Sequence, residues 1–385
     1  MILVSAKVGP FRSMNSEQTV EIDPTVTVFV GMNEAGKTVL LKTLHKSSDA
    51  VGEDEFDPVD DYPRKDLSSY LKQHKTEPAT ATVLTYELEE SEVGAANEAL
   101  KTKLPPGYRI AVTHKYDNTL QLSLPVDETP VIQAFAKTLS SDAQTAMKEA
   151  KTLRAIPDLL KEASLTAEDN ATLASLNTRL QATKWPNVSQ WEVWSHVQAN
   201  VPKFLYFSDY DTLPGKMNLA DLAQRAEAAK NDPKQLTAAH RSVLALLRMA
   251  DISMEDLVSP GSYEELKAKI EGVSISLTDQ VMEFWKQNED LEVEVDLKAD
   301  PTDAVPFNNG VNLYLRIKNR RHRGVSTPFD QRSRGFIWFF SFLVWFDSVQ
   351  HQLDPSGKSA GKKLILFLDE PGLALHALAQ ADFLR

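Results

Sequence analysis

Eight residues near the N-terminus have the types and spacing that bind the phosphates of a nucleotide. The stretch Gly31–Thr38 reads Gly-Met-Asn-Glu-Ala-Gly-Lys-Thr, with glycine where backbone N–H groups must turn inward toward an anion. Lys37 can place a cation on the β- and γ-phosphates, and the Thr38 hydroxyl is a hard oxygen ligand for Mg²⁺. The pattern predicts an ATP-binding loop formed by Asn33, Glu34, Ala35, Gly36, Lys37, Thr38 and Val39.

A second set of chemically useful residues lies near the other end of the chain. The apolar run Leu364–Leu368 is followed directly by Asp369 and Glu370. A buried parallel strand ending in two carboxylates suits a phosphate loop, because one carboxylate can hold Mg²⁺ while the other orients the attacking water. We therefore predict Asp369 and Thr38 as metal ligands, and Glu370 and Lys37 as catalytic residues. Asp-Glu-Pro is also typical of an ordinary turn after a strand. The acidic pair therefore indicates a nucleotide site only because the chain also contains the phosphate loop.

Three short sequences together resemble a known family. Phe11-Arg12-Ser13, Gly31–Thr38 and the run from Asp369, which reads Asp-Glu-Pro-Gly-Leu-Ala-Leu-His, resemble the ABC-type ATPases of the SMC/RecF/Rad50 branch. The likeness is greatest to the OLD (overcoming lysogenization defect) ATPases, which are bacterial and phage-defence proteins. The resemblance implies an α/β fold, namely an ABC-type P-loop NTPase with a mixed sheet and a helical, dimerisation-type insertion. It also implies ATP and Mg²⁺ as cofactors.

The resemblance assigns roles to residues outside the two motifs. Arg12 matches a turn close to the nucleotide, and His376 matches the histidine of the loop after the acidic pair. Ser333 and Gly335 stand where the family carries its signature motif, which in a dimer meets the γ-phosphate held by the other subunit. The usual Leu-Ser-Gly-Gly is replaced here by Gln-Arg-Ser-Arg-Gly at 331–335. The alternatives are a surface arginine for Arg12 and an N-capped core helix for Ser333.

Hydrophobic spacing predicts the elements that must position these residues. Short apolar runs predict strands at Ile2–Val8, Thr19–Ile22 and Thr25–Val30, the last ending at the phosphate loop. Lys37–His45 has helical spacing, so the loop is expected between a strand and a helix, as phosphate binding requires. The acidic, proline-containing stretch Gly52–Asp66 predicts a solvated loop.

Changes of pattern along the chain predict its domain organisation. Residues 1–128 carry the first strands and the phosphate loop, as the N-terminal part of an ATPase lobe. Residues 129–288 are dominated by helical patterns and predict an insertion or dimerisation region. Residues 289–385 return to strands and complete the lobe with the signature-like helix and the acidic strand. Because members of the family continue with more strands and a switch histidine, we expect a chain truncated after Arg385.

Composition narrows the classes of protein that this chain can represent. Its 385 residues include no cysteine, which excludes disulfides and cysteine-bound zinc. No signal peptide or membrane-length apolar run is present, so we expect a cytoplasmic protein without membrane contact. The formal net charge of −12 is opposite to the balance of a wide DNA-binding surface. A DNA contact would be local, and the basic stretch Lys318–Arg323 is either such a contact or a solvated hairpin tip.

These observations predict the ATP-binding and ATP-hydrolysing module of an OLD-like DNA-processing or phage-defence protein. ATP-dependent closure of a homodimer or higher homo-oligomer would gate a nuclease located in a C-terminal domain or a partner. The acidic cluster Glu53–Asp61 is more simply a solvated loop than a nuclease site. Two alternatives stay open: a RecF/SMC-like DNA repair ATPase without nuclease, and a non-hydrolysing nucleotide-sensing scaffold.

Overall fold

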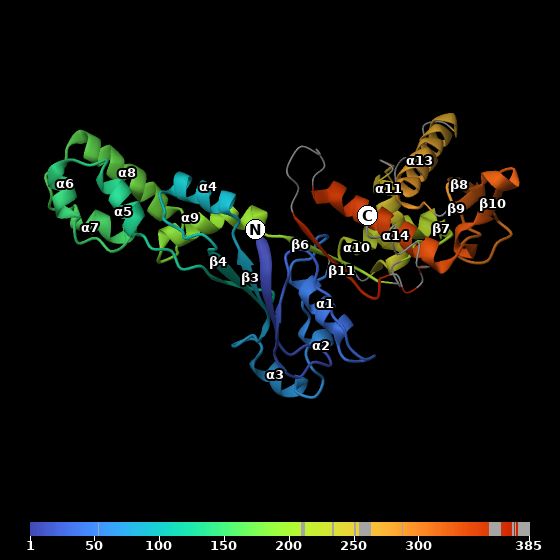
Figure 1. The fold of residues 1–385 in the computed structure, drawn as a ribbon, viewed down its shortest axis with the longest axis horizontal. Helices are drawn as coiled ribbons and strands as arrows, with labels where there is room; N and C mark the ends of the chain where they lie inside the picture. Colours follow the sequence, from blue (N-terminus) through green and yellow to red (C-terminus); the bar gives the residue numbers. More distant parts are fainter. Residues whose placement is uncertain are drawn as a thin grey trace. The chain divides into compact units, whose positions relative to one another are not determined.

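A computed structural model shows that this chain has a mixed α/β fold (Figure 1). Helices and strands alternate irregularly along the sequence. The structure describes residues 1–52, 54–208, 212–232, 235–249, 252–253, 263–286, 288–353, 363–371, 373 and 375. Two compact units divide the chain. The first comprises Met1–Phe204 with Lys362–Ile365, and the second comprises Leu205–Gly361 with Leu366–Arg385.

An antiparallel sheet forms the centre of the first unit, and its strands β3 and β4 are labelled in Figure 1. The strand order is β2-β1-β3-β4-β5. The strands are β1 Ile2–Val8, β2 Gln18–Glu21, β3 Thr80–Glu87, β4 Arg109–Lys115 and β5 Leu120–Ser123. Ala6 of β1 pairs with Val20 on one side and with Leu84 on the other. The predicted strands Ile2–Val8 and Thr19–Ile22 are therefore confirmed.

Helix α1, Lys37–Ser47, follows the phosphate loop and confirms the predicted helix. Its leucines Leu40, Leu41 and Leu44 are buried, and the helix packs on β1 and β3. The Ser47 and Thr82 hydroxyls lie 2.7 Å apart in a buried hydrogen bond between α1 and β3. This packing fixes the helix whose first residues belong to the phosphate loop.

The predicted strand Thr25–Val30 does not form, and this prediction is wrong. Val26, Val28 and Val30 are 71%, 74% and 90% exposed. Alternating valines favour an extended backbone, but a strand also needs a neighbouring strand to accept and donate its hydrogen bonds. The phosphate loop is thus followed by its helix but is not preceded by a strand in the described structure.

The remaining helices of the first unit lie between and after its strands. Those close to the sheet in sequence are α2 Pro58–Asp61, α3 Leu67–Gln73 and α4 Glu90–Leu100. The later ones are α5 Thr129–Ala136, α6 Ser141–Ala146, α7 Ile156–Leu159, α8 Ala167–Gln181 and α9 Val188–Val197. Buried Asp169 links α6 to α8, because it accepts hydrogen bonds from Ser140 N at 2.8 Å and Thr166 N at 2.9 Å.

The second unit packs helices around a four-stranded antiparallel sheet in which β9 pairs with the three other strands. The strands are β7 Lys216–Asn218, β8 Leu291–Ala299, β9 Val311–Asn319 and β10 Val325–Pro328. The helices are α10 Leu219–Ala229, α11 Ala238–Met249, α13 Tyr263–Phe284 and α14 Arg334–Leu353. The core of this unit is mainly aliphatic and also holds a group of aromatic residues, among them Phe207, Phe329, Phe336, Trp338, Phe339 and Phe340. The helices expected between 129 and 288 are therefore shared between the two units.

Two further strands pair with each other, β6 Lys203–Phe207 and β11 Leu364–Leu368. Lys203 N donates to Lys363 O at 2.9 Å, and Asp369 N donates to Phe207 O at 3.1 Å. The starts of the two strands lie together and so do their ends, so the strands run parallel. The strand expected at Leu364–Leu368 is confirmed. The expectation that it is buried is wrong, because only Phe367 among its residues is buried.

Four short 3₁₀ helices complete the described elements: Leu153–Ala155, Gln198–Asn200, Arg320–His322 and Phe329–Gln331. Within the described residues, no helix combines the length and the apolar character that crossing a bilayer would require.

Candidate functional site

The phosphate loop is curled around the amine of its own lysine. Lys37 Nζ donates to the carbonyl oxygens of Gly31 and Met32, both at 2.9 Å. Gly36 has φ 94° and ψ 10°, a left-handed conformation that favours glycine. A Cβ on Gly31 would lie 3.3 Å from Ala35 Cβ, which is a tight contact across the loop. The two glycines of the motif therefore have separate roles. Gly36 allows the left-handed backbone, and Gly31 allows the two sides of the loop to approach each other closely.

The N-terminus of α1 is suited to an anion. Gly36 is its N-cap and has no side chain to accept a hydrogen bond, and no acidic residue lies in the first turn. The first N–H groups of a helix have no intrahelical acceptor, and the helix dipole is positive at this end. With the Lys37 amine beside it, this end fits a phosphate group.

Three of the candidate site residues have a left-handed backbone although they are not glycine: Arg12 with φ 48°, Glu34 with φ 64° and Glu370 with φ 51°. The other non-glycine residues with positive φ in the described chain are Lys101, Asn118 and Arg323, and each ends a helix or lies in a hairpin turn. A left-handed backbone costs a non-glycine residue roughly 1–2 kcal/mol. Such strain tends to occur at functional sites.

Arg12 lies in the tight turn Phe11–Met14, beside the phosphate loop. Phe11 N donates to Met14 O at 2.9 Å and Met14 N to Phe11 O at 2.8 Å. A Cβ on Gly36 would lie 3.8 Å from Met14 Cγ, so the turn contacts the loop. The guanidinium of Arg12 is held by Asp61, whose Oδ1 accepts from Nε at 3.2 Å and from Nη2 at 2.8 Å.

Asp61 belongs to the stretch expected to be a solvated loop, and for this residue the expectation is wrong. Its side chain is fully buried at the end of α2. Its Oδ2 accepts from Lys46 Nζ at 2.7 Å and from Asp57 N at 3.0 Å. With two cations and a backbone N–H as partners, the carboxylate can be buried at little cost.

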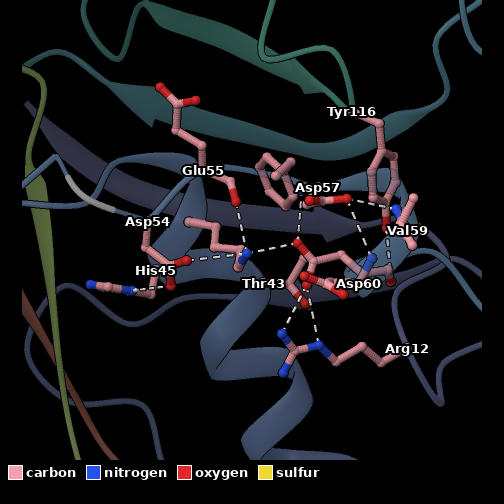
Figure 2. A network of polar contacts seen from close by, with 12 residues as sticks. Arg12, Thr43, His45, Asp54, Glu55, Asp57, Val59, Asp60 and Tyr116 are labelled. Atoms are coloured by element: carbon pink, nitrogen blue, oxygen red, sulfur yellow. Dashed lines mark hydrogen bonds and ion pairs between the residues drawn. The ribbon is translucent and has the colours of Figure 1, made fainter. Parts of the chain in front are cut away.

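The contacts of Asp61 belong to a larger polar network that extends from Arg12 to His45 and Asp54 (Figure 2). His45 Nε2 lies 3.1 Å from Asp49 Oδ1, and His45 Nδ1 lies 3.6 Å from Asp54 Oδ2. Burial alone would lower the pKa of His45, but the hydrogen bonds and charges of these two carboxylates raise it to about 9. Burial works the other way on Asp54, whose pKa His45 and Lys46 nevertheless lower to about 2. The network therefore ties the end of α1 to the acidic stretch by charge.

The acidic pair lies in the second unit, at the end of β11. Asp369 Oδ2 accepts a hydrogen bond from the Tyr206 hydroxyl at 2.9 Å. Tyr206 lies on β6, the strand that pairs with β11. Glu370 is exposed. His376 and the glycine of the same motif, Gly372, lie outside the described residues.

The signature-like residues form the start of α14. Phe336 N donates to Ser333 Oγ at 3.4 Å, so Ser333 caps the helix with a long hydrogen bond. Ser333 is exposed, whereas Gly335 is buried in the first turn. This is the geometry of an N-capped core helix, and it also places a serine hydroxyl at a helix N-terminus, where an anion could bind.

The basic stretch at 318–323 is largely neutralised by acidic side chains of β8 and its approach. Lys318 Nζ lies 2.7 Å from Glu294 Oε1, and Arg320 Nη2 lies 2.6 Å from Glu292 Oε1. Arg321 pairs with Asp290. This pairing favours the interpretation of a solvated hairpin tip over a DNA contact.

The structure brings together some of the predicted site residues and divides the rest. Arg12 and the loop from Asn33 to Val39 share the first unit, whereas Asp369, Glu370, Ser333 and Gly335 belong to the second. Sequence reasoning missed Asp61, His45, Lys46 and Tyr206. The pair His45-Lys46 at the end of a helix, followed by an acid-rich stretch, was the available signal for an ion-pair network.

Neither a comparison with protein-family models nor one with curated protein sequences gives a match for this chain. Among the described residues, no group of three or more histidine, aspartate or glutamate side chains is placed to hold a metal ion. The geometry of the loop, its helix and the acidic pair is therefore the basis on which a function can be argued.

Proposed function

We propose that this chain binds MgATP through Gly31–Thr38 and hydrolyses it. The observation that carries the proposal is the loop itself, where Lys37 Nζ lies on two backbone carbonyls and the chain enters α1 without a side-chain cap. A phosphate that takes the place of those carbonyls meets a cation and the positive end of a helix together. The left-handed backbone of Glu34 and Glu370 supports the same interpretation.

Each candidate residue has a chemical role in this proposal. Bound MgATP supplies the phosphoanhydride bond and a divalent charge beside its phosphates. Lys37 would bind β- and γ-phosphate oxygens, Thr38 and Asp369 would hold Mg²⁺, and Glu370 would orient the attacking water as general base. Tyr206 fixes the direction of the Asp369 carboxylate.

At the level of the whole protein, we propose an ABC-type P-loop ATPase of the OLD-like kind, acting in DNA processing or phage defence. Ser333 and Gly335 would contact nucleotide held by a second copy, so ATP would close a homodimer and hydrolysis would open it. That cycle would gate a nuclease outside this chain. This finer assignment is supported by the resemblance of Phe11-Arg12-Ser13, Gly31–Thr38 and the run from Asp369 to the OLD ATPases.

Equilibrium binding of a fluorescent MgATP analogue and steady-state ATP turnover test the proposal. Lys37→Ala should weaken binding at least about ten-fold, because it removes a charge-assisted contact to phosphate. Lys42→Ala, on the same helix but away from the loop, is the matched control and should bind as the unmodified protein does. Glu370→Gln should keep binding and lose turnover by roughly 10²–10⁴-fold.

The binding and turnover results distinguish the proposed ATPase from its alternatives. If the unmodified protein binds no MgATP, or if Lys37→Ala binds as tightly as Lys42→Ala, the proposal is overturned. Turnover that is unchanged in Glu370→Gln would overturn the hydrolytic role and favour a nucleotide-sensing scaffold. DNA-stimulated turnover by the intact protein without DNA cleavage would favour a RecF/SMC-like repair ATPase.

A further inference from the structure

We propose that Asp61 is a positioning residue of the nucleotide site and acts through Arg12. This inference rests on the proposed function, in which Gly31–Thr38 binds MgATP. Neither the phosphate-loop motif nor the acidic pair includes Asp61, which lies 24 positions after Lys37 in the sequence.

Asp61 holds Arg12 by backbone and side chain together. Arg12 N donates to Asp61 O at 2.7 Å, and the guanidinium donates twice to Asp61 Oδ1. The Tyr116 hydroxyl donates to Pro10 O at 2.6 Å, next to the same turn. Because the Met14 side chain of that turn lies next to Gly36, Asp61 holds both Arg12 and a turn that is adjacent to the phosphate loop.

The way Asp61 binds Arg12 leaves part of the guanidinium available. Nε and Nη2 point to the carboxylate, while Nη1 makes no hydrogen bond within the part of the chain that the structure describes. The Arg12 side chain is 38% exposed. A guanidinium carries five N–H donors in one fixed plane, so one edge can be anchored on a carboxylate while the rest faces an anion. Arg12 is thereby held in one orientation, and its guanidinium keeps a nitrogen that makes no hydrogen bond to the described residues.

A purely structural role for Asp61 makes a different prediction. Lys46 is buried and binds Asp61 on its other oxygen, and it also donates to Glu55 O at 2.7 Å. If Asp61 only anchored the acidic stretch to α1, loss of Lys46 would disturb the nucleotide site as much as loss of Asp61. If Asp61 acts through Arg12, loss of Lys46 leaves the contact between Arg12 and Asp61 in place. Lys46→Met is therefore the matched control.

The test measures the dissociation constant of the MgATP analogue for single and double variants of the full chain. Arg12→Ala and Asp61→Asn should each weaken binding by roughly ten-fold, the size expected for one charge-assisted hydrogen bond. The double variant Arg12→Ala/Asp61→Asn should bind no more weakly than either single variant, because both remove the same contact. Lys46→Met should change binding by less than about three-fold.

Arg12→Lys keeps the test decisive if Asp61→Asn does not fold, as circular dichroism would show. A lysine amine offers a point charge in place of a planar fork, so it cannot hold Asp61 and face a phosphate at once. We expect Arg12→Lys to bind MgATP as weakly as Arg12→Ala. Binding of Arg12→Lys at the level of the unmodified protein would overturn the inference.

The controls separate this inference from the proposed function. If Lys37→Ala does not reduce binding, the proposed function itself fails. If Lys37→Ala loses binding while Asp61→Asn binds normally, the nucleotide site stands and Asp61 has no positioning role. Additive losses in the double variant, or an equal loss in Lys46→Met, would also overturn the role of Asp61.

Discussion

His45 lies near the C-terminal end of α1 between Asp49 and Asp54, so its charge contributes to stability over a defined pH range. In the folded protein its pKa is raised from 6.5 to about 9. A raised histidine pKa stabilises the fold fully below the unfolded value of 6.5, and the contribution is lost as pH rises to about 9. The charge also suits the negative end of the helix dipole.

We predict that His45→Gln removes this pH dependence. At pH 6 the variant should be less stable than the unmodified protein, by on the order of 2 kcal/mol for a shift of this size. The difference should shrink as pH rises from 6.5 toward and beyond 9, as His45 loses its proton in the folded state as well. Urea unfolding at a series of pH values measures this, with His196→Gln on the exposed side of α9 as control. A difference that is constant with pH would contradict the prediction.

Tyr206 has a separate effect on the acidic pair. Its hydroxyl donates to Asp369 Oδ2, and Asp369 is the Mg²⁺ ligand that we propose. A residue that orients a metal ligand from outside the metal shell commonly affects activity by roughly 10–100-fold. Tyr206→Phe should therefore raise the Mg²⁺ concentration needed for half-maximal ATP turnover by about ten-fold. Binding of the nucleotide to the loop in the first unit should change little.

Tyr314→Phe is the matched control for this change. Tyr314 lies on β9 in the same unit, and its aromatic ring is 5.2 Å from Lys216 Nζ. No hydrogen bond of its hydroxyl is found within the described residues. Equal Mg²⁺ requirements for Tyr206→Phe, Tyr314→Phe and the unmodified protein would show that Asp369 needs no support from Tyr206.

At the scale of elements, β8 has one backbone edge that pairs with no strand in the described structure. Helix α13 covers this edge with hydroxyl groups instead. Val293 N donates to Thr278 Oγ1 at 2.9 Å, and Val295 N donates to Ser274 Oγ at 3.0 Å. Capping by side chains protects such an edge from pairing with a strand of another chain.

We predict that the double variant Ser274→Ala/Thr278→Val lowers the free energy of unfolding by roughly 1–3 kcal/mol, because two N–H groups lose their acceptors. Amide exchange at Val293 and Val295 should accelerate, and self-association should increase with concentration. Ser276→Ala is the control, since Ser276 lies exposed on the same helix. Unchanged exchange in the double variant would refute the role of the hydroxyls.

At the scale of the whole molecule, the charge distribution determines what is expected of the proposed contact with DNA. The net charge is −12, and the basic stretch 318–323 is paired with acids of β8 and Asp290. Phosphate contacts need cations that can release counterions from DNA. The unmodified chain should therefore bind DNA weakly, with a shallow dependence on salt.

Glu292→Gln/Glu294→Gln should release Lys318 and Arg320 and tighten DNA binding by about ten-fold at low salt, with a steeper salt slope. Fluorescence anisotropy with a labelled duplex measures both quantities. Glu283→Gln/Glu289→Gln changes the net charge equally but alters two exposed acids that make no ion pair with the basic stretch within the described residues. Equal tightening in both double variants would mean that net charge, and not the local pairs, controls binding.

The sequence by itself determined the features that depend on neighbours in the chain. Leu40, Leu41 and Leu44 have helical spacing, and α1 forms with those leucines buried. Gly36 and Lys37 predict a turn into a helix, and the backbone angles of Gly36 agree. The hairpin of β4 and β5 turns at Asn118, where sequence indicates a turn. Local sterics and helix periodicity suffice for each of these.

Only the tertiary structure decided the features that depend on distant partners. The valines of 25–30 predict a strand, yet no neighbouring strand pairs with them. Asp61 belongs to an acidic stretch that looks solvated, yet it is buried because Arg12 and Lys46, 49 and 15 positions away, supply its charge partners. Strand pairing and charge burial are set by contacts across the fold, and a local pattern does not contain them.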